Sequence, residues 1–204
     1  MTRALLFGGS FDPIHHGHLI VARFVAEQLG VVRVVLIPGA APPHKLDRQL
    51  TVGAERLAAC RLAVADEPLF EVCDWELTQP GPNYTLNTVN HFRAALGPGV
   101  ELCWLLGMDS LLELHTWYRA TELVELCTFV TAVRPGCVPP DAAQLARHFS
   151  PAQAARLVTH IVASPCLDIA STEIRARVRA GRSIRYLVPG PVRKFIDERG
   201  LYRA

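Results

Sequence analysis

The sequence predicts an α/β fold with a mostly parallel sheet, helices on both faces of the sheet and a helical C-terminal section. Short apolar runs of strand length alternate with amphipathic stretches of helical length along the chain. A glycine-rich turn follows the first apolar run, as in the βαβ units that build parallel sheets. No segment has the length and polarity of an interdomain linker, so residues 1–204 are expected to form one domain.

The expected elements follow this alternation in order. A βαβ unit opens the chain, with strands at 4–7 and 31–37 around a helix at 19–29. Further strands are expected at 70–77, 100–106, 128–133 and 160–163. Further helices are expected from the cap Thr51 to residue 65, at 85–96, from 109, at 121–126, within 141–157, at 171–180 and at 191–199.

The composition excludes several classes of protein. Lys and Arg number 21, Asp and Glu number 19, and 50% of the residues are hydrophobic, which is typical of a globular domain rather than a disordered or fibrous chain. The nearly balanced charge lacks the broad basic face of proteins that bind duplex nucleic acid or membrane surfaces. The apolar runs are much shorter than the roughly 18 residues of a membrane span, and no secretory signal opens the sequence, so a cytoplasmic location is expected.

The six cysteines are scattered without a Cys-x-x-Cys pair, which argues against a thiolate zinc site or a redox pair. Cys103 and Cys127 lie within apolar runs and are expected in the core. His91, His115, His148 and His160 stand alone in the sequence and are expected to be structural.

The segment from Gly8 to His18 reads Gly-Gly-Ser-Phe-Asp-Pro-Ile-His-His-Gly-His and joins the first strand to the first helix. In α/β sheets, ligands bind at this carboxyl end of a strand. The glycines let a ligand approach the backbone, and the helix start presents N–H groups to an anion. His15, His16 and His18 add imidazole donors, so the segment predicts a polyphosphate site.

Other readings of this segment remain open. It lacks the Gly-Lys of a P-loop, the Gly-x-Gly-x-x-Gly of a dinucleotide fold and the closing glycine of a nucleophile elbow. The histidines could instead cap a polar loop or hold a metal ion. Asp12 precedes Pro13, which favours a turn role in which its carboxylate accepts backbone N–H groups.

Gly9–His18 resembles the His-x-Gly-His signature of nucleotidyltransferases, which His15, Gly17 and His18 fill. The segment Ile169–Arg175 is similar to the second signature of that superfamily, Ile-Ser-Ser-Thr-x-x-Arg. Four further motifs and the C-terminus resemble, in order, features of bacterial nicotinate-nucleotide adenylyltransferases: Pro42–Lys45, Asn83–Thr85, Gly107–Leu111, Thr116–Tyr118 and Gly200–Arg203. This resemblance implies a Rossmann-like nucleotidyltransferase fold.

The resemblance also implies the reaction. The adenylyl group of ATP would pass to nicotinate mononucleotide, giving nicotinate adenine dinucleotide and pyrophosphate in NAD biosynthesis. The attacking phosphate, with a second pKa of about 6, is largely ionised at pH 7, so no general base is needed. Mg²⁺ would arrive with ATP and be held mainly by phosphate oxygens and water, without a metal site on the protein. Neither nucleic acid nor membrane is expected as a partner.

The resemblance assigns roles to individual residues. The catalytic group would comprise His15, His18, Lys45 and Arg175. ATP would be bound by Gly8, Gly9, Ser10, Phe11, His15, His18, Gly107, Asp109, Arg134, Ser171, Thr172 and Arg175. The mononucleotide would be bound by Tyr84, Thr85, Trp117 and Tyr118, with the nicotinate ring stacked on Trp117.

Plainer roles stay open for several of these residues. Trp117 could belong to the core, Asp109 could cap its helix, Lys45 could be a solvated loop charge, and Arg175 could form a surface ion pair. The sequence also departs from the family at two places, with Gly39 where relatives carry Asn and Ala170 where they carry Ser.

Three alternative functions remain compatible with the sequence. Nicotinamide mononucleotide differs from the expected substrate by one amide. Phosphopantetheine adenylyltransferases share the superfamily, but those enzymes usually carry Thr where His15 stands. A nucleotide-binding regulator would keep the fold without turnover.

Overall fold

A parallel sheet organises the chain in the computed structural model, which describes residues 2–39, 50–133 and 136–203. Within these residues the strand order is β3-β2-β1-β4-β5-β6. The order reverses between β1 and β4, and such a switch point is where open α/β sheets bind ligands. The strands are β1 (Thr2–Gly9), β2 (Val34–Pro38), β3 (Phe70–Val72), β4 (Val100–Gly107), β5 (Thr128–Val133) and β6 (Ile161–Ala163).

Helices fill the connections between these strands, and two of them close the chain. They are α1 (His16–Leu29), α2 (Gly53–Ala63), α3 (Trp75–Thr78), α4 (Thr85–Leu96), α5 (Met108–Glu113), the 3-10 helix η2 (Leu114–Thr116), α6 (Ala120–Leu126), α7 (Ala142–Leu145), α8 (Pro151–Thr159), α9 (Ser171–Arg179) and α10 (Gly190–Arg199). The predicted α/β fold with a parallel sheet and a helical C-terminal section is confirmed.

The chain folds into two compact units. Unit 1 consists of Met1–Gly8, Ala22–Val34 and Tyr84–Cys166. Unit 2 consists of Gly9–Val21, Val35–Asn83 and Leu167–Ala204. Each unit is assembled from three separate stretches of sequence, so neither could be recognised from a single linker.

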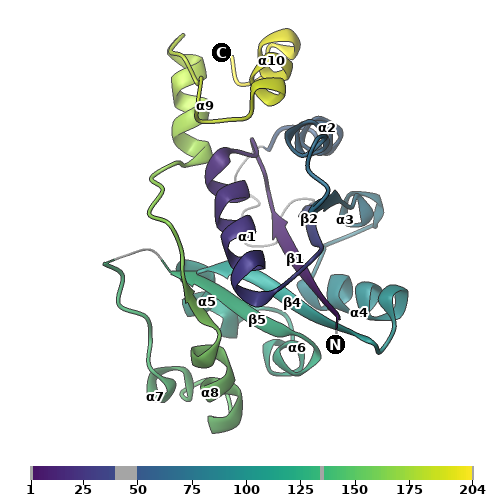
Figure 1. Ribbon diagram of the computed structural model, residues 1–204, viewed down its shortest axis with the longest axis vertical. Helices are drawn as coiled ribbons and strands as arrows, with labels where there is room; N and C mark the ends of the chain where they lie inside the picture. Colours follow the sequence, from purple (N-terminus) through teal and green to yellow (C-terminus); the bar gives the residue numbers. More distant parts are fainter. Residues whose placement is uncertain (1, 40–49, 134–135, 204) are drawn as a thin grey trace. The chain divides into compact units, whose positions relative to one another are not determined.

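Unit 1 contains the parallel pairs β1–β4, β4–β5 and β5–β6. Leu6 lies opposite Trp104, and Leu106 lies opposite Thr131. The run Leu102–Leu106 is buried throughout, as expected for a strand covered on both faces. Helices α4 and α6 pack on each other and on β4 and β5 (Figure 1).

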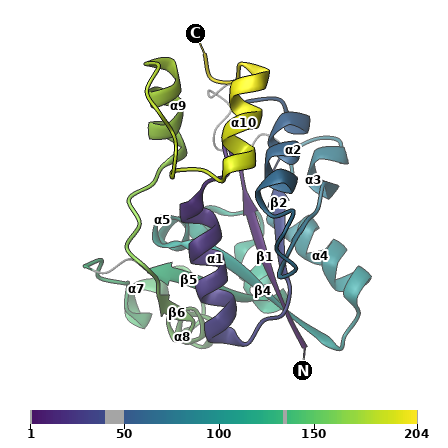
Figure 2. The same cartoon turned by 45° about the horizontal axis from the view of Figure 1, so that its top comes forward.

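Unit 2 contains β2, whose five residues are all buried, together with β3, α2, α3 and the C-terminal helices. Helix α10 packs beside α2 (Figure 2), with Val192 and Ile196 in its buried face. Gly200 ends α10 in a left-handed conformation with φ 60°, which a glycine adopts without strain.

Two predicted element bounds are wrong. The strand predicted at 70–77 ends at Val72, and α3 follows with Leu77 packed over Gly53, where an added Cβ would lie 2.8 Å from Leu77 Cδ2. Thr51 does not cap α2, which begins at Gly53 after Val52. The backbone N–H of Thr51 instead donates to Asp12 at 3.4 Å.

The cysteines of the described residues are unpaired, and Cys103 and Cys127 are buried as predicted. Burial raises the pKa of the Cys103 thiol to about 11, so this side chain is an inert core residue. Among the helices that the structure describes, none has both the length and the apolarity to cross a membrane.

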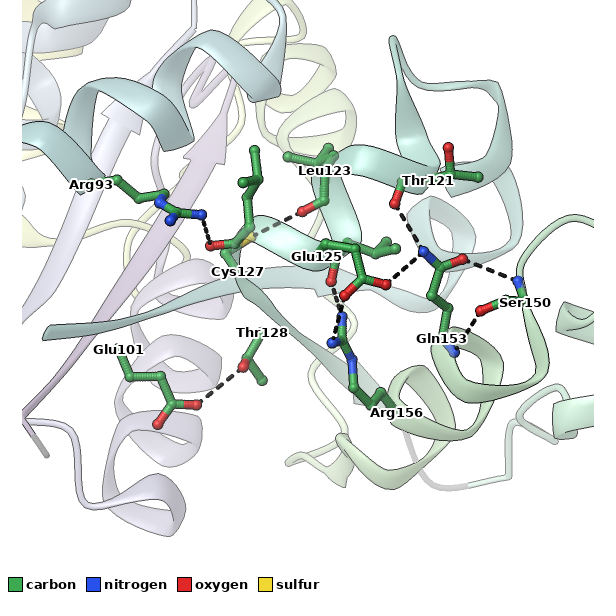
Figure 3. Close-up of polar contacts among 12 residues, drawn as sticks. Arg93, Glu101, Thr121, Leu123, Glu125, Cys127, Thr128, Ser150, Gln153 and Arg156 are labelled. Atoms are coloured by element: carbon green, nitrogen blue, oxygen red, sulfur yellow. Dashed lines mark hydrogen bonds and ion pairs between the residues drawn. The ribbon is translucent and has the colours of Figure 1, made fainter. Parts of the chain in front are cut away.

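Carbonyls of α6 accept hydrogen bonds from side chains of neighbouring helices (Figure 3). Gln153 donates to the carbonyl of Thr121, in the first turn, at 2.9 Å, and Arg156 donates to that of Val124, in the last turn. Arg93 reaches the carbonyl of Leu126 at 3.3 Å. Two guanidinium groups at this end also complement the helix dipole, so the network fixes α6 against α4 and α8.

One buried hydroxyl in unit 1 lacks a hydrogen-bond partner. Thr131 is fully buried in β5, and its Oγ1 finds no partner among the described residues. We expect Thr131→Val to raise the free energy of unfolding by about 1 kcal/mol, because it removes an unsatisfied polar group at nearly constant volume. Urea denaturation at pH 7 measures this change.

Thr128→Val is the matched control in the same strand. Thr128 Oγ1 donates to Glu101 Oε1 at 3.1 Å (Figure 3), so this substitution is expected to lower stability by about 1 kcal/mol. Equal losses for the two variants would contradict the assignment of Thr131 as unsatisfied.

Candidate functional site

The loop that leaves β1 carries the first predicted motif and belongs to unit 2 from Gly9 onward. The backbone N–H of Gly39 donates to the Gly9 carbonyl at 2.9 Å. Arg56 Nη1 donates to the Ser10 carbonyl at 2.6 Å. Phe11 has a left-handed backbone (φ 44°) and a side chain that is 1% exposed. Hydrogen bonds to its backbone carbonyls and the buried Phe11 side chain therefore hold this loop in one conformation.

His15 and His18 lie face to face at the start of α1. Their ring centroids are 3.6 Å apart, with an angle of 21° between the planes. The backbone N–H of His15 donates to His18 Nδ1 at 3.3 Å, and that of His18 donates to His15 Nδ1 at 3.4 Å. Because both Nδ1 atoms accept, the neutral rings carry their protons on Nε2.

Both imidazoles are neutral at pH 7. Burial lowers the pKa of His15 from 6.5 to about 4, and the neighbouring His16 adds to this shift. Burial and His15 likewise lower the pKa of His18 well below its ordinary value. A phosphate approaching the Nε2 atoms would favour the charged form and reverse these shifts.

Gly17 lies directly against the stacked rings. A Cβ at this position would lie 3.0 Å from His15 Nδ1 and 3.5 Å from Ile169 Cβ. A larger residue would press on the His15 ring and shift it by a few tenths of an ångström, which favours glycine between the histidines. The Cβ positions of Gly8 and Gly9 meet the rings of Trp104 and Phe11, so the chain itself explains these glycines through close packing.

The second predicted motif contacts the first within unit 2. Helix α9 begins at Ser171, whose hydroxyl donates to the Pro13 carbonyl at 2.9 Å. Arg175 Nη1 donates to the Asp12 carbonyl at 2.5 Å, and its Nη2 donates to Thr172 Oγ1 at 3.4 Å. The structure therefore brings together two segments that lie about 150 residues apart in the sequence.

These contacts exclude the plainer role considered for Arg175. Its side chain is 9% exposed rather than lying on a helix surface, and it donates to a backbone carbonyl and a hydroxyl. Ala170 is the N-cap residue of α9 and gives no side-chain cap. No side chain therefore replaces the Ser hydroxyl that relatives carry at this position.

Unit 1 carries the residues expected at the two nucleosides. Tyr84 and Tyr118 stack with centroids 4.4 Å apart. Trp117 is half-buried and meets Phe129 edge-on at 6.3 Å, so only part of its ring lies in the core. Asp109 is exposed in the first turn of α5, whose N-cap is Gly107, so Asp109 is not the capping residue. Thr85 begins α4.

Two residues expected in the site, Lys45 and Arg134, lie outside the described residues. Three others that hold the loop were missed at the sequence level: Thr51, Arg56 and Tyr202. For Arg56 a signal existed, because it shares the buried face of α2 with Ala59 and Cys60, where a charge needs partners.

The donor set of this loop suits an anion better than a metal ion. Within the described ranges, no group of three or more His, Cys, Asp or Glu side chains is arranged to hold a metal. His15 and His18 use their Nδ1 atoms internally and offer N–H groups. Together with a guanidinium and the start of α9, these donors can bind phosphate oxygens and stabilise charge that develops on them.

Unit 1 has a cavity of about 500 Å³ whose lining includes none of the predicted site residues. Its lining includes Val100 and Thr128, the first residues of β4 and β5, so it opens at the amino edge of the sheet. The arginines that line it, Arg93 and Arg156, bind the carbonyls of α6 (Figure 3). The cavity therefore belongs to the support of α6.

Comparisons with known proteins converge on one family. The model of the cytidylyltransferase-like family matches residues 6–177. A protein of Thermomicrobium roseum named a probable nicotinate-nucleotide adenylyltransferase is 41% identical over 203 residues, covering 100% of this chain and 92% of its own length. One of Symbiobacterium thermophilum with the same name is 40% identical over 202 residues, covering 99% and 96%.

Solved structures show the same fold. A Plasmodium falciparum nicotinic acid mononucleotide adenylyltransferase, solved in complex with NaAD, superimposes with a TM-score of 0.77 at 18% identity. The superposition covers 99% of this chain and 98% of that one. The predicted Rossmann-like nucleotidyltransferase fold is confirmed.

The lowered pKa values of the stacked imidazoles predict acid sensitivity. The unfolded chain binds protons at these histidines near pH 6.5, whereas folded His15 binds one only near pH 4. The stabilising difference is therefore present above pH 6.5 and is lost as the pH falls towards 4. In urea denaturation between pH 7 and 4.5, the free energy of unfolding should fall more steeply for the wild type than for His15→Asn. Equal slopes for the two proteins would contradict this prediction. His115→Asn, which changes an exposed histidine, is the control and should follow the wild type.

Proposed function

The chain belongs to the cytidylyltransferase-like family and, within it, to the nicotinate-nucleotide adenylyltransferases, and we propose that it transfers the adenylyl group of ATP to nicotinate mononucleotide through the site described above. The products are nicotinate adenine dinucleotide and pyrophosphate, in a step of NAD biosynthesis. The observation that carries the proposal is the contact between the two motifs in unit 2, which joins two imidazole donors and Arg175 to one loop.

The chemistry asks little of the protein beyond alignment and charge stabilisation. The nucleophile is a phosphate oxygen that is already ionised, so no residue needs to remove a proton. It attacks the α-phosphorus of ATP, and pyrophosphate leaves with the electron pair of the broken P–O bond. Charge develops on the α-phosphate oxygens and on the leaving group, where fixed N–H donors are most effective.

The donors of unit 2 match this need. His15 and His18 present Nε2–H groups, and their neutral state avoids two stacked cations before ATP binds. Arg175 and Lys45 supply the permanent positive charge in this proposal. Ser171 and Thr172 contribute backbone N–H groups at the start of α9, while Gly8, Gly9, Ser10 and Phe11 form the loop that carries the histidines.

Mg²⁺ enters this scheme as part of the substrate. The described residues offer no carboxylate cluster for it, and both carboxylate oxygens of Asp12 accept hydrogen bonds from the chain. Phosphate oxygens and water are its expected ligands, and it would offset part of the triphosphate charge.

The mononucleotide and the adenosine take their contacts from unit 1. The nicotinate ring stacks on the exposed part of Trp117, and Tyr84, Thr85 and Tyr118 surround it. Gly107 and Asp109 contact the ribose of adenosine, with Arg134 near the adenine. The exposed carboxylate of Asp109 is suited to accept ribose hydroxyls. The cytoplasmic location expected from the sequence stays a prediction.

A pyrophosphate-release assay tests the function. ATP with nicotinate mononucleotide should give rapid release, and the amide mononucleotide and phosphopantetheine should give much less. If phosphopantetheine were the one acceptor of the three that gave release with ATP, the chain would be a phosphopantetheine adenylyltransferase. ATP binding without release for any acceptor would identify a regulator, and equal rates with acid and amide would remove the preference for the acid.

His18→Ala is expected to lower kcat by about 10²–10³-fold, because it removes one donor that acts on the developing charge. Steady-state pyrophosphate release measures this loss. His115→Ala, which replaces an exposed histidine of unit 1, should leave kcat unchanged. Near-normal turnover of His18→Ala would remove His18 from the catalytic group.

Trp117→Ala is expected to raise KM for nicotinate mononucleotide about 10-fold, because stacking stabilises the bound ring in the ground state and the transition state alike. The dissociation constant for ATP, measured by calorimetry, should stay within about twofold of wild type. A large loss of ATP affinity would contradict the placement of the nicotinate ring.

A further inference from the structure

The C-terminal end of the chain returns to the loop that follows β1, residues 10–15, inside unit 2. The Tyr202 hydroxyl donates to Asp12 Oδ1 at 2.8 Å, across 190 residues of sequence. Asp12 is 2% exposed, so this bond satisfies a carboxylate that water barely reaches. The loop after β1 is thus joined to the turn that follows α10.

Tyr202 is held in place by the helix before it. Gly200 caps α10, and the Leu201 N–H donates to the Ile196 carbonyl at 3.0 Å. Tyr202 itself has a left-handed backbone with φ 62°, a conformation that packing must maintain in a residue other than glycine. Helix α10 packs on α2, so the hydroxyl projects from a fixed support.

Asp12 is a junction between four segments. Its Oδ2 accepts the Thr51 N–H at 3.4 Å, and its backbone carbonyl accepts Arg175 Nη1 at 2.5 Å. Arg56, which is 3% exposed, adds a brace by donating to the Ser10 carbonyl at 2.6 Å and the Thr51 carbonyl at 2.8 Å. A shift of Asp12 would therefore move the acceptor that orients Arg175.

The hydroxyl is a donor across the working pH range. Burial and the adjacent Asp12 carboxylate both raise the pKa of Tyr202, so its proton stays on the oxygen. The charge of Asp12 strengthens the bond, since an ionised acceptor shortens and stabilises a hydrogen bond.

We infer that Tyr202 is a positioning residue for adenylyl transfer: its hydroxyl fixes Asp12, and through the Asp12 carbonyl it orients Arg175 against the loop that carries His15 and His18. The inference rests on the proposed function. Tyr202 itself contacts no phosphate in this scheme. Phosphoryl transfer depends strongly on alignment, and a displacement of about 1 Å can cost a large part of the rate.

The test is Tyr202→Phe, which removes one oxygen and keeps the ring. We expect kcat to fall about 10-fold, with KM for nicotinate mononucleotide unchanged. Tyr186→Phe is the matched control, because Tyr186 belongs to the same unit, is 78% exposed and lies in contact with the guanidinium of Arg185 through its ring face. Thermal melting shows whether each variant is folded at the assay temperature.

A second pair of variants separates positioning from stability. In Asp12→Asn one oxygen can still accept from Tyr202, while the amide NH2 takes the place of the oxygen that accepts the Thr51 N–H, whereas Asp12→Ala has no acceptor. Positioning predicts that Asp12→Asn retains clearly more of kcat than Asp12→Ala. It also predicts that Tyr202→Phe has no further effect in the Asp12→Ala background, because the two act through one bond.

The outcomes are distinct. Wild-type kcat in folded Tyr202→Phe overturns the inference, as do additive losses in the double variant. If Tyr202→Phe does not fold, the Asp12 pair decides: equal losses for Asn and Ala overturn the inference, and rescue by Asn supports it. Failure of the wild-type chain to release pyrophosphate with any acceptor contradicts the proposed function instead, since it involves no change at Tyr202.

Discussion

The hydrogen bond from Arg175 to the Asp12 carbonyl is the contact on which the candidate site depends. It joins the loop after β1 to helix α9, and the Ser171–Pro13 bond beside it joins the same two segments. A guanidinium on a backbone carbonyl keeps its full positive charge, because the carbonyl is a dipole and not a counter-ion. The bond thus places a cation next to the histidine loop without neutralising it.

Burial sets the electrostatic state of this loop. Desolvation lowers the pKa of both stacked imidazoles, so they add donors but no charge before the nucleotide arrives. Positive charge is left to arginine, which stays protonated under all relevant conditions. Neutral imidazoles beside a charged arginine suit a highly charged anionic ligand. Two stacked imidazolium rings would repel each other while that ligand was absent.

The support around the loop is drawn from residues with no evident chemical role. Arg56 and Thr51 brace Ser10 and Asp12 from α2 and the turn before it, and Tyr202 closes the arrangement from the C-terminus. Helices α2 and α10 pack together, so these braces share one rigid base. Unit 1 is stabilised separately, by its continuous apolar strands and by the arginine side chains that bind the last carbonyls of α6.

The sequence by itself determined the alternation of strands and helices, the His-x-Gly-His loop and its second signature, because apolar period and motif spelling are local properties. Helix 85–96 and strand 128–133 match the structure to the residue. It could not show that the strand predicted at 70–77 ends at Val72, where α3 and its contact between Leu77 and Gly53 follow, or that the Thr51 N–H donates to Asp12. These contacts join residues that are distant in the sequence. The role of Tyr202 was decided only by the tertiary structure, since a hydrogen bond across 190 residues leaves no periodic trace in the chain.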